Sequence, residues 1–112
     1  MKEYEVLDLE YGYPPVLEAM NTLKYQLTLY RKCNIKCILI IHGYGSSGEG
    51  GKIRSRVRKY LESELKNGTI KKVVYGERFD IFNGDARDLK SRFKQLEGLS
   101  KQNNHGVTVV EL

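Results

Sequence analysis

Residues 37–51, CILIIHGYGSSGEGG, decide the fold of this 112-residue chain. The apolar run from Cys37 to Ile41 is short and bounded by loop residues, which is the pattern of a central strand covered on at least one face. Closely spaced glycines follow, and such a stretch suits a backbone that must bend and be approached closely. A basic segment with helical periodicity comes next. The sequence therefore predicts a strand, a glycine loop and a helix N-terminus in succession.

Apolar spacing on both sides of this join predicts alternating strands and helices. We expect strands at 4–10, 37–42, 70–75 and 107–112 and helices at about 15–32 and about 53–65. We also expect a third helix that carries Leu89, Phe93 and Leu96 and is capped by Asn83 or Asp85. Such alternation predicts a partly parallel sheet with right-handed crossovers, hence a small α/β layer fold. Residues 1–112 are long enough for one domain and too short for two.

Composition narrows the class of protein. Charged residues make up 29% of the chain and hydrophobic residues 40%, a balance typical of a globular domain. The longest apolar run has five residues, so no membrane span is expected, and the N-terminus lacks a secretory signal, so a cytoplasmic location is expected. Cys33 and Cys37 are too few for a disulfide framework or a tetrahedral zinc site and are interpreted as reduced thiols.

Positive charge is concentrated in the middle of the chain. The net charge is +5, and residues 24–72 carry twelve of the 19 basic residues but three of the 14 acidic ones. A helix N-terminus adds unpaired N–H groups and a positive dipole. We therefore predict a phosphate or nucleic-acid site built from Gly43, Tyr44, Gly45, Ser46, Lys52, Arg54 and Arg58. The alternative is a basic helix face that is simply solvated.

The glycine loop also matches nucleotide-binding patterns in part. Residues 43–48 fit G-x-G-x-x-G, but the preceding strand is the second one, and the acidic residues about 20 positions on lie in the next helix. The triphosphate-binding loop is excluded, because Lys52 is followed by Ile53 instead of Ser or Thr.

Two carboxylates and an imidazole form a second candidate site. Asp8 and Glu10 are two apart on a predicted strand and project from the same side, and His42 ends the next strand. At the mouth of the sheet these three are candidate catalytic residues, with His42 as general base or acid and Asp8 orienting it. Asp8 and Glu10 together are also candidate ligands for Mg²⁺ or Mn²⁺. The alternative is a pair of exposed carboxylates and a histidine bonded to a neighbouring loop.

In order along the chain, these residues resemble the small MutS-related (Smr) domain. Its first motif, L-D-L-H-G, is approximated by residues 7–12, LDLEYG, and its second, an apolar strand ending in H-G-x-G, by residues 40–45, IIHGYG. Its closing strand, G-V-T-V-V-E-L, is matched by residues 106–112. The resemblance extends over nearly the whole chain.

The resemblance implies a two-layer α/β sandwich similar to the C-terminal domain of bacterial translation initiation factor three. Its four-stranded sheet would be mostly parallel or mixed, with two main helices and a third helix inserted at about 77–104. The resemblance also implies nucleic-acid binding and endonuclease activity, as nicking of DNA or cleavage of RNA. The implied partners are nucleic acid and either the ribosome or repair and recombination assemblies, with no membrane.

Glu10 stands where the first motif has histidine. Two interpretations are compatible with this replacement. One is a nuclease that uses a divalent cation for cleavage. The other is a catalytically inactive RNA- or DNA-binding module, or a protein-interaction module that uses the third helix; binding alone needs no cofactor. The sequence leaves these alternatives open.

Overall fold

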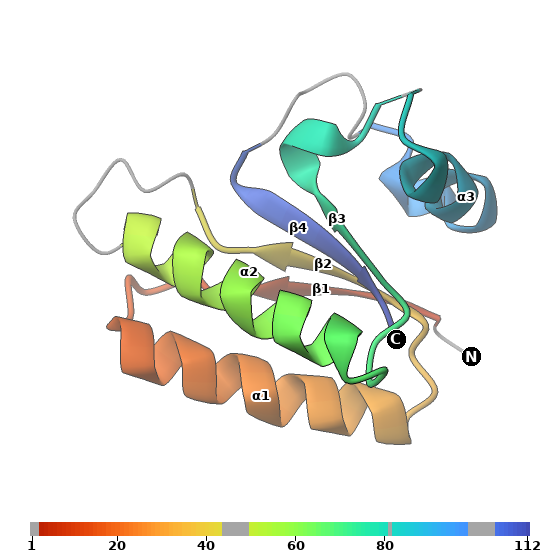
Figure 1. The fold of residues 1–112 in the computed structure, drawn as a ribbon. Helices are drawn as coiled ribbons and strands as arrows, with labels where there is room; N and C mark the ends of the chain where they lie inside the picture. Colours follow the sequence, from red (N-terminus) through yellow and green to blue (C-terminus); the bar gives the residue numbers. More distant parts are fainter. Residues whose placement is uncertain (1–2, 44–49, 81, 99–104) are drawn as a thin grey trace.

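The computed structural model describes residues 3–43, 50–80, 82–98 and 105–112 (Figure 1). Within these ranges the elements are β1 (Tyr4–Asp8), α1 (Val16–Lys32), β2 (Cys37–Ile41), α2 (Gly50–Lys66), β3 (Lys72–Tyr75), η1 (Gly76–Arg78), α3 (Gly84–Arg92), η2 (Lys94–Leu96) and β4 (Val107–Glu111), where η marks a short 3-10 turn. Of the helices in these ranges, none has the length and apolarity needed to span a bilayer.

The four strands form one mixed sheet in the order β1-β2-β4-β3. β1 and β2 are parallel and joined through α1, and Asp8 pairs with Ile41 at their carboxyl ends. β4 lies antiparallel between β2 and β3. This confirms the predicted α/β fold with a mixed sheet.

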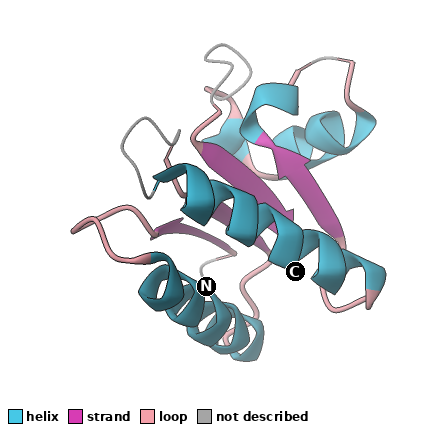
Figure 2. Cartoon of the chain, turned by 60° about the vertical axis from the view of Figure 1, so that its left-hand side comes forward, coloured by secondary structure: helices cyan, strands magenta, loops and turns pink. Residues whose placement is uncertain are grey.

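The helices lie on both faces of the sheet (Figure 2). α1 and α2 pack together on one face, where Leu23 and Leu61 meet Ile38 and Ile40. α3 and η2 cover the other face over β4 and β3, where Leu89 packs near Val109. The two-layer sandwich of sheet and paired helices is confirmed, and α3 adds a partial cover on the second face. All five residues of β4 are buried because both of its faces are covered.

The predicted third helix is shorter than its apolar spacing suggests. α3 ends at Arg92, Phe93 has extended backbone, and Leu96 lies in η2. Of the two predicted caps it is Asn83 whose side chain accepts a hydrogen bond, from the Ala86 N–H at 3.0 Å. Phe93 and Leu96 are buried against the sheet, so they are not available as a docking surface.

The first strand ends at Asp8, two residues earlier than predicted. The chain then turns, and the Tyr13 N–H donates to the Glu10 carbonyl at 2.9 Å. Gly12 and Tyr13 both have positive φ, at 79° and 51°. Glycine adopts this backbone region without strain, whereas a bulky residue rarely does. The loop between β1 and α1 is therefore a defined turn.

Candidate nucleic-acid interface

The residues that directly follow β1 and β2 lie at the same edge of the sheet. This follows from the parallel pairing of the two strands, which the Leu9 N–H extends by donating to the Ile41 carbonyl at 2.8 Å. The structure thus brings Asp8, Glu10 and His42 to one edge, as the sequence predicts. Their side chains, however, do not form one cluster.

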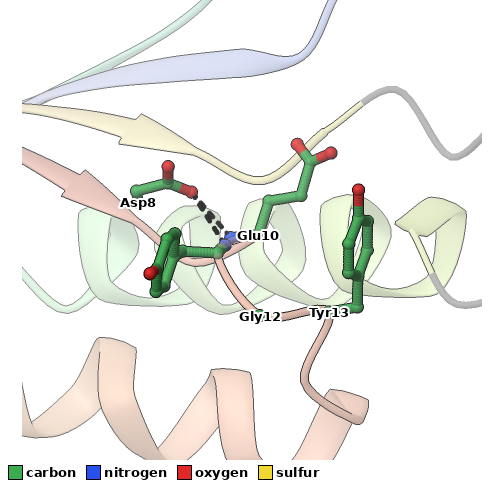
Figure 3. Close-up of a pocket in the computed structure, with 5 residues that line it drawn as sticks. Asp8, Glu10, Gly12 and Tyr13 are labelled. Atoms are coloured by element: carbon green, nitrogen blue, oxygen red, sulfur yellow. Dashed lines mark hydrogen bonds between the residues drawn. The ribbon is translucent and has the colours of Figure 1, made fainter.

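Asp8 organises the loop after β1. Its Oδ1 accepts hydrogen bonds from the backbone N–H groups of Glu10 at 2.9 Å and Tyr11 at 3.1 Å. Short acidic side chains commonly satisfy a turn in this way. In Figure 3 the carboxylates of Asp8 and Glu10 point in different directions. Asp8 therefore orients the backbone of its own loop, and within the described residues it makes no hydrogen bond to His42.

Glu10 reaches across to the end of β2. A Cβ placed on Gly43 would lie 2.7 Å from Glu10 Oε2, so the carboxylate lies directly against the Gly43 Cα. Gly43 also has a φ of +83°. The positive φ favours glycine at this position, whereas the exposed Glu10 side chain could move away from a larger residue. The Gly43 N–H donates to the Gly106 carbonyl at 3.0 Å, so this amide, part of the predicted phosphate site, is already paired.

His42 is buried, with 0% of its surface exposed. Nδ1 lies 3.0 Å from the Gly43 carbonyl, which can only accept, so Nδ1 carries the proton. Nε2 then accepts from the Thr108 hydroxyl at 2.8 Å. Burial lowers the pKa of His42 from 6.5 to about 4, and the charges of Arg58 and Arg54 act in the same direction. The imidazole is therefore neutral at pH 7, and both ring nitrogens are hydrogen-bonded within the protein, an arrangement that does not favour an acid or base role.

Arg58 points into the protein. Its guanidinium makes two hydrogen bonds of 2.7 Å to Glu77 and further bonds to Thr108 Oγ1 and the Val107 carbonyl, and it lies over the Tyr75 ring. Burial alone would raise the pKa of Glu77, but the hydrogen bonds from Arg58 outweigh it and the pKa is lowered. Arg58, predicted to contact phosphate, thus has its charge matched inside the fold.

The hydrogen-bond network of His42, Thr108, Arg58 and Glu77 was not predicted from the sequence. Thr108 and Glu77 were not among the candidate residues, yet Thr108 connects His42 to Arg58 and Glu77 pairs with Arg58. One available signal is Thr108 itself, a hydroxyl within an otherwise apolar segment of β4. A buried polar group requires a hydrogen-bonding partner.

The first turns of α2 carry exposed positive charge. Lys52 and Arg56 are exposed, Arg54 is half-buried, and within the described residues none of the three takes part in an ion pair. Lys52 and Arg56 line an open hollow of about 460 Å³ with Val16, at the start of α1. The beginning of α2 therefore adjoins the segment that follows the β1–α1 loop.

The loop between β1 and α1 carries two exposed aromatic side chains near the start of α1. Tyr11 and Tyr13 are 87% and 82% exposed. With Asp8, Glu10 and Gly12 they line a second open hollow, of about 430 Å³ (Figure 3). We call Tyr11, Tyr13, Lys52, Arg54 and Arg56 the loop–helix edge.

The Smr domain family model matches residues 12–78, more than half of the chain. The chain belongs to the Smr domain family. It is also similar to the crystal structure of the Smr domain of Thermus thermophilus MutS2, with a TM-score of 0.60 and 19% identity over 96% of each chain. That match concerns the fold. None of the curated proteins matches the chain.

The family assignment confirms the resemblance but does not assign roles to individual residues of this Smr domain. Tyr44, Gly45 and Ser46, predicted to bind phosphate, lie outside the described residues. The family match ends at residue 78, and α3 and η2 follow it. That residues 77–104 are an insertion into a single domain stays a prediction.

A divalent cation in this Smr domain also stays a prediction. Within the described ranges, no three His, Cys, Asp or Glu side chains are grouped as metal ligands. Asp8 and Glu10 supply two carboxylates, and Oδ1 of Asp8 already accepts two backbone hydrogen bonds. Mg²⁺ bound by one or two carboxylates takes its remaining oxygens from water or from substrate phosphate.

Proposed function

We propose that this Smr domain binds nucleic acid through the loop–helix edge. The observation that carries the proposal is the exposure of Lys52 and Arg56 in the first turns of α2, without an ion pair among the described residues. Cations of this kind bind the phosphate backbone and release its counterions. The helix dipole adds positive potential at the same end of α2.

The ion pairs on the opposite face of the sheet support this choice of surface. There Lys72 and Arg92 both pair with Asp88 and Glu111. Their charges are balanced within the protein, whereas Lys52 and Arg56 at the start of α2 form no ion pair with another described residue. The proposal covers both DNA and RNA, with repair or recombination assemblies and the ribosome as the settings implied by the family resemblance.

Neutralising two cations of the edge tests the proposal. We expect Lys52→Gln/Arg56→Gln to weaken binding of labelled DNA and RNA oligonucleotides about tenfold or more at low salt. The slope of log affinity against log salt concentration should flatten by about two, one for each phosphate group that is no longer neutralised. Fluorescence anisotropy over a salt series measures both quantities.

The matched control is Lys32→Gln/Lys66→Gln. These exposed lysines end α1 and α2, far along both helices from the edge, and their replacement changes the net charge by the same amount. We expect it to leave affinity within about twofold of wild type, with little change in the salt slope. Equal reductions in affinity for the two double variants would contradict a localised site.

An endonuclease is the second candidate function, and the position of Glu10 favours it. Its exposed carboxylate lies at the edge of the sheet against Gly43. Within the described residues it makes no side-chain hydrogen bond or ion pair. Such a carboxylate can act as a general base toward water, or share a divalent cation with Asp8.

Cleavage of single-stranded RNA, duplex DNA and supercoiled plasmid, in Mg²⁺, Mn²⁺ or EDTA, tests this second function. We expect Glu10→Gln to reduce cleavage about 10²–10⁴-fold, because it removes the proposed base or ligand. Asp8→Asn keeps an acceptor for the two loop amides, so it separates the two roles: cleavage should persist if Glu10 acts alone as a base and should fall if Asp8 shares a cation with it. If wild-type protein binds these substrates without cutting them, the domain is a binding module.

A further inference from the structure

Two aromatic side chains are held in solvent on the loop between β1 and α1. Tyr11 and Tyr13 are more exposed than Tyr25, at 67%, while Tyr4, Tyr30, Tyr60 and Tyr75 are half-buried. Burial of an aromatic ring is one of the larger favourable contributions to folding, and Tyr11 and Tyr13 do not make this contribution because they are exposed. Exposed aromatic rings of this kind are typical of binding surfaces.

The backbone presents these rings in a defined way. The Asp8 carboxylate accepts from the Tyr11 N–H, and the Tyr13 N–H donates to the Glu10 carbonyl. Tyr13 also has a φ of 51°, which a bulky residue adopts at an energetic cost. In Figure 3 the Tyr13 ring extends from the loop on the same side as the Glu10 carboxylate. The loop is thus ordered while its aromatic surface is left uncovered.

The start of α1 connects the loop that carries the two tyrosines to the cations of α2. Tyr13 precedes α1 by three residues, and Val16 at the start of α1 lines the same hollow as Lys52 and Arg56. A basic track beside aromatic rings is the combination that binds single strands, because the cations hold the backbone and successive bases stack on the rings.

We propose that Tyr11 and Tyr13 stack on unpaired bases, so that the loop–helix edge selects single-stranded or locally unpaired nucleic acid over duplex. This rests on the proposed function. In a duplex each base is already stacked between neighbours, so only an unpaired base can offer its face to a ring.

The charges of the loop–helix edge indicate where the nucleic-acid backbone and the bases would lie. Asp8 and Glu10 line the same hollow as the tyrosines, and their carboxylates repel phosphate. The backbone therefore follows Lys52 and Arg56 on α2, and the bases turn toward the loop. Carboxylates there accept hydrogen bonds from base amino groups, such as cytosine N4.

The test compares one oligonucleotide as a single strand and as a duplex. We expect Tyr11→Leu/Tyr13→Leu to bind the single strand about tenfold more weakly or worse, with a much smaller loss of duplex affinity and little change in the salt slope. Phenylalanine at both positions should recover most of the affinity, because it restores the ring face. Tyr25→Leu, an exposed tyrosine on α1, is the matched control. A 2-aminopurine placed in the single strand reports stacking by its loss of fluorescence.

The two proposals fail in different ways. If Lys52→Gln/Arg56→Gln loses binding while the leucine variant binds the single strand like wild type, the stacking role is wrong and the nucleic-acid interface stands. If the leucine variant weakens single strand and duplex equally, stacking is also wrong. If wild-type protein binds neither form, both proposals fall.

Discussion

Lowering the pH from 7 to 4 is expected to remove roughly 3 kcal/mol of the free energy of unfolding through one side chain, His42. Its pKa is about 4 in the folded protein, against 6.5 for an ordinary histidine. Between these values the unfolded chain binds a proton that the folded protein does not. Stability is therefore fully present above about pH 6.5 and is lost as the pH falls toward 4. Burial is the main cause, and Arg58 and Arg54 add to it, while the Gly43 carbonyl and Glu77 oppose it.

Urea unfolding at several pH values between 7 and 4 measures this loss. His42→Gln should be less stable at pH 7 and should lack this part of the pH dependence, whereas His105→Gln, which removes the other histidine, should keep it. The lowered pKa values of Glu77, Asp88 and Glu111 act mainly below about pH 4.5 and are common to both variants. A direct titration of the His42 ring by NMR gives the pKa independently. A midpoint near 6.5 would contradict the buried, neutral assignment.

The edge where the candidate residues meet was predictable, because it depends on two neighbouring strands. Parallel pairing of β1 and β2 aligns their carboxyl ends, so Asp8, Glu10 and His42 had to emerge together. The order of the strands was not predictable from their alternation. β4 comes last in the chain but lies beside β2, and this places Thr108 against the His42 ring. The chemistry open to His42 therefore depends on a contact 66 residues away.

Helical periodicity alone also could not predict which arginines of α2 are free to bind phosphate. A spacing of four puts Arg54 and Arg58 on one face, which suggested a common phosphate-binding role. That spacing says nothing about what lies opposite each position. Arg58 meets Glu77 in η1, which follows β3, while Arg54 lies one turn nearer the start of the helix, without an ion pair among the described residues. Equivalent residues on one helix face thus differ because a distant turn covers only one of them.

Replacing Arg58 with Met is expected to cost about 3 kcal/mol of the free energy of unfolding. The pair with Glu77 is largely shielded from solvent, with 12% and 22% of the two side chains exposed, and its two hydrogen bonds are short. Methionine keeps the apolar stem but leaves the Glu77 carboxylate without its main partner. Glu77→Gln should cost less, because the amide can still accept from Arg58. Denaturant midpoints of both single variants and of Arg58→Met/Glu77→Met measure the coupling, which we expect to be about 1–3 kcal/mol.

Arg54→Met is the matched comparison on the same helix face. Arg54 is half-buried and, in the described part of the chain, has no ion pair, so its replacement should change the free energy of unfolding by about 0.5 kcal/mol or less. Nucleic-acid affinity should show the reverse order, with Arg54→Met weakening binding and folded Arg58→Met protein binding close to wild type. If Arg58→Met instead keeps its stability and loses binding, the pair with Glu77 must open to release the guanidinium to phosphate. In that case Arg58 would be the phosphate ligand that its place on the helix predicts, and the network from His42 to Glu77 would change when nucleic acid binds.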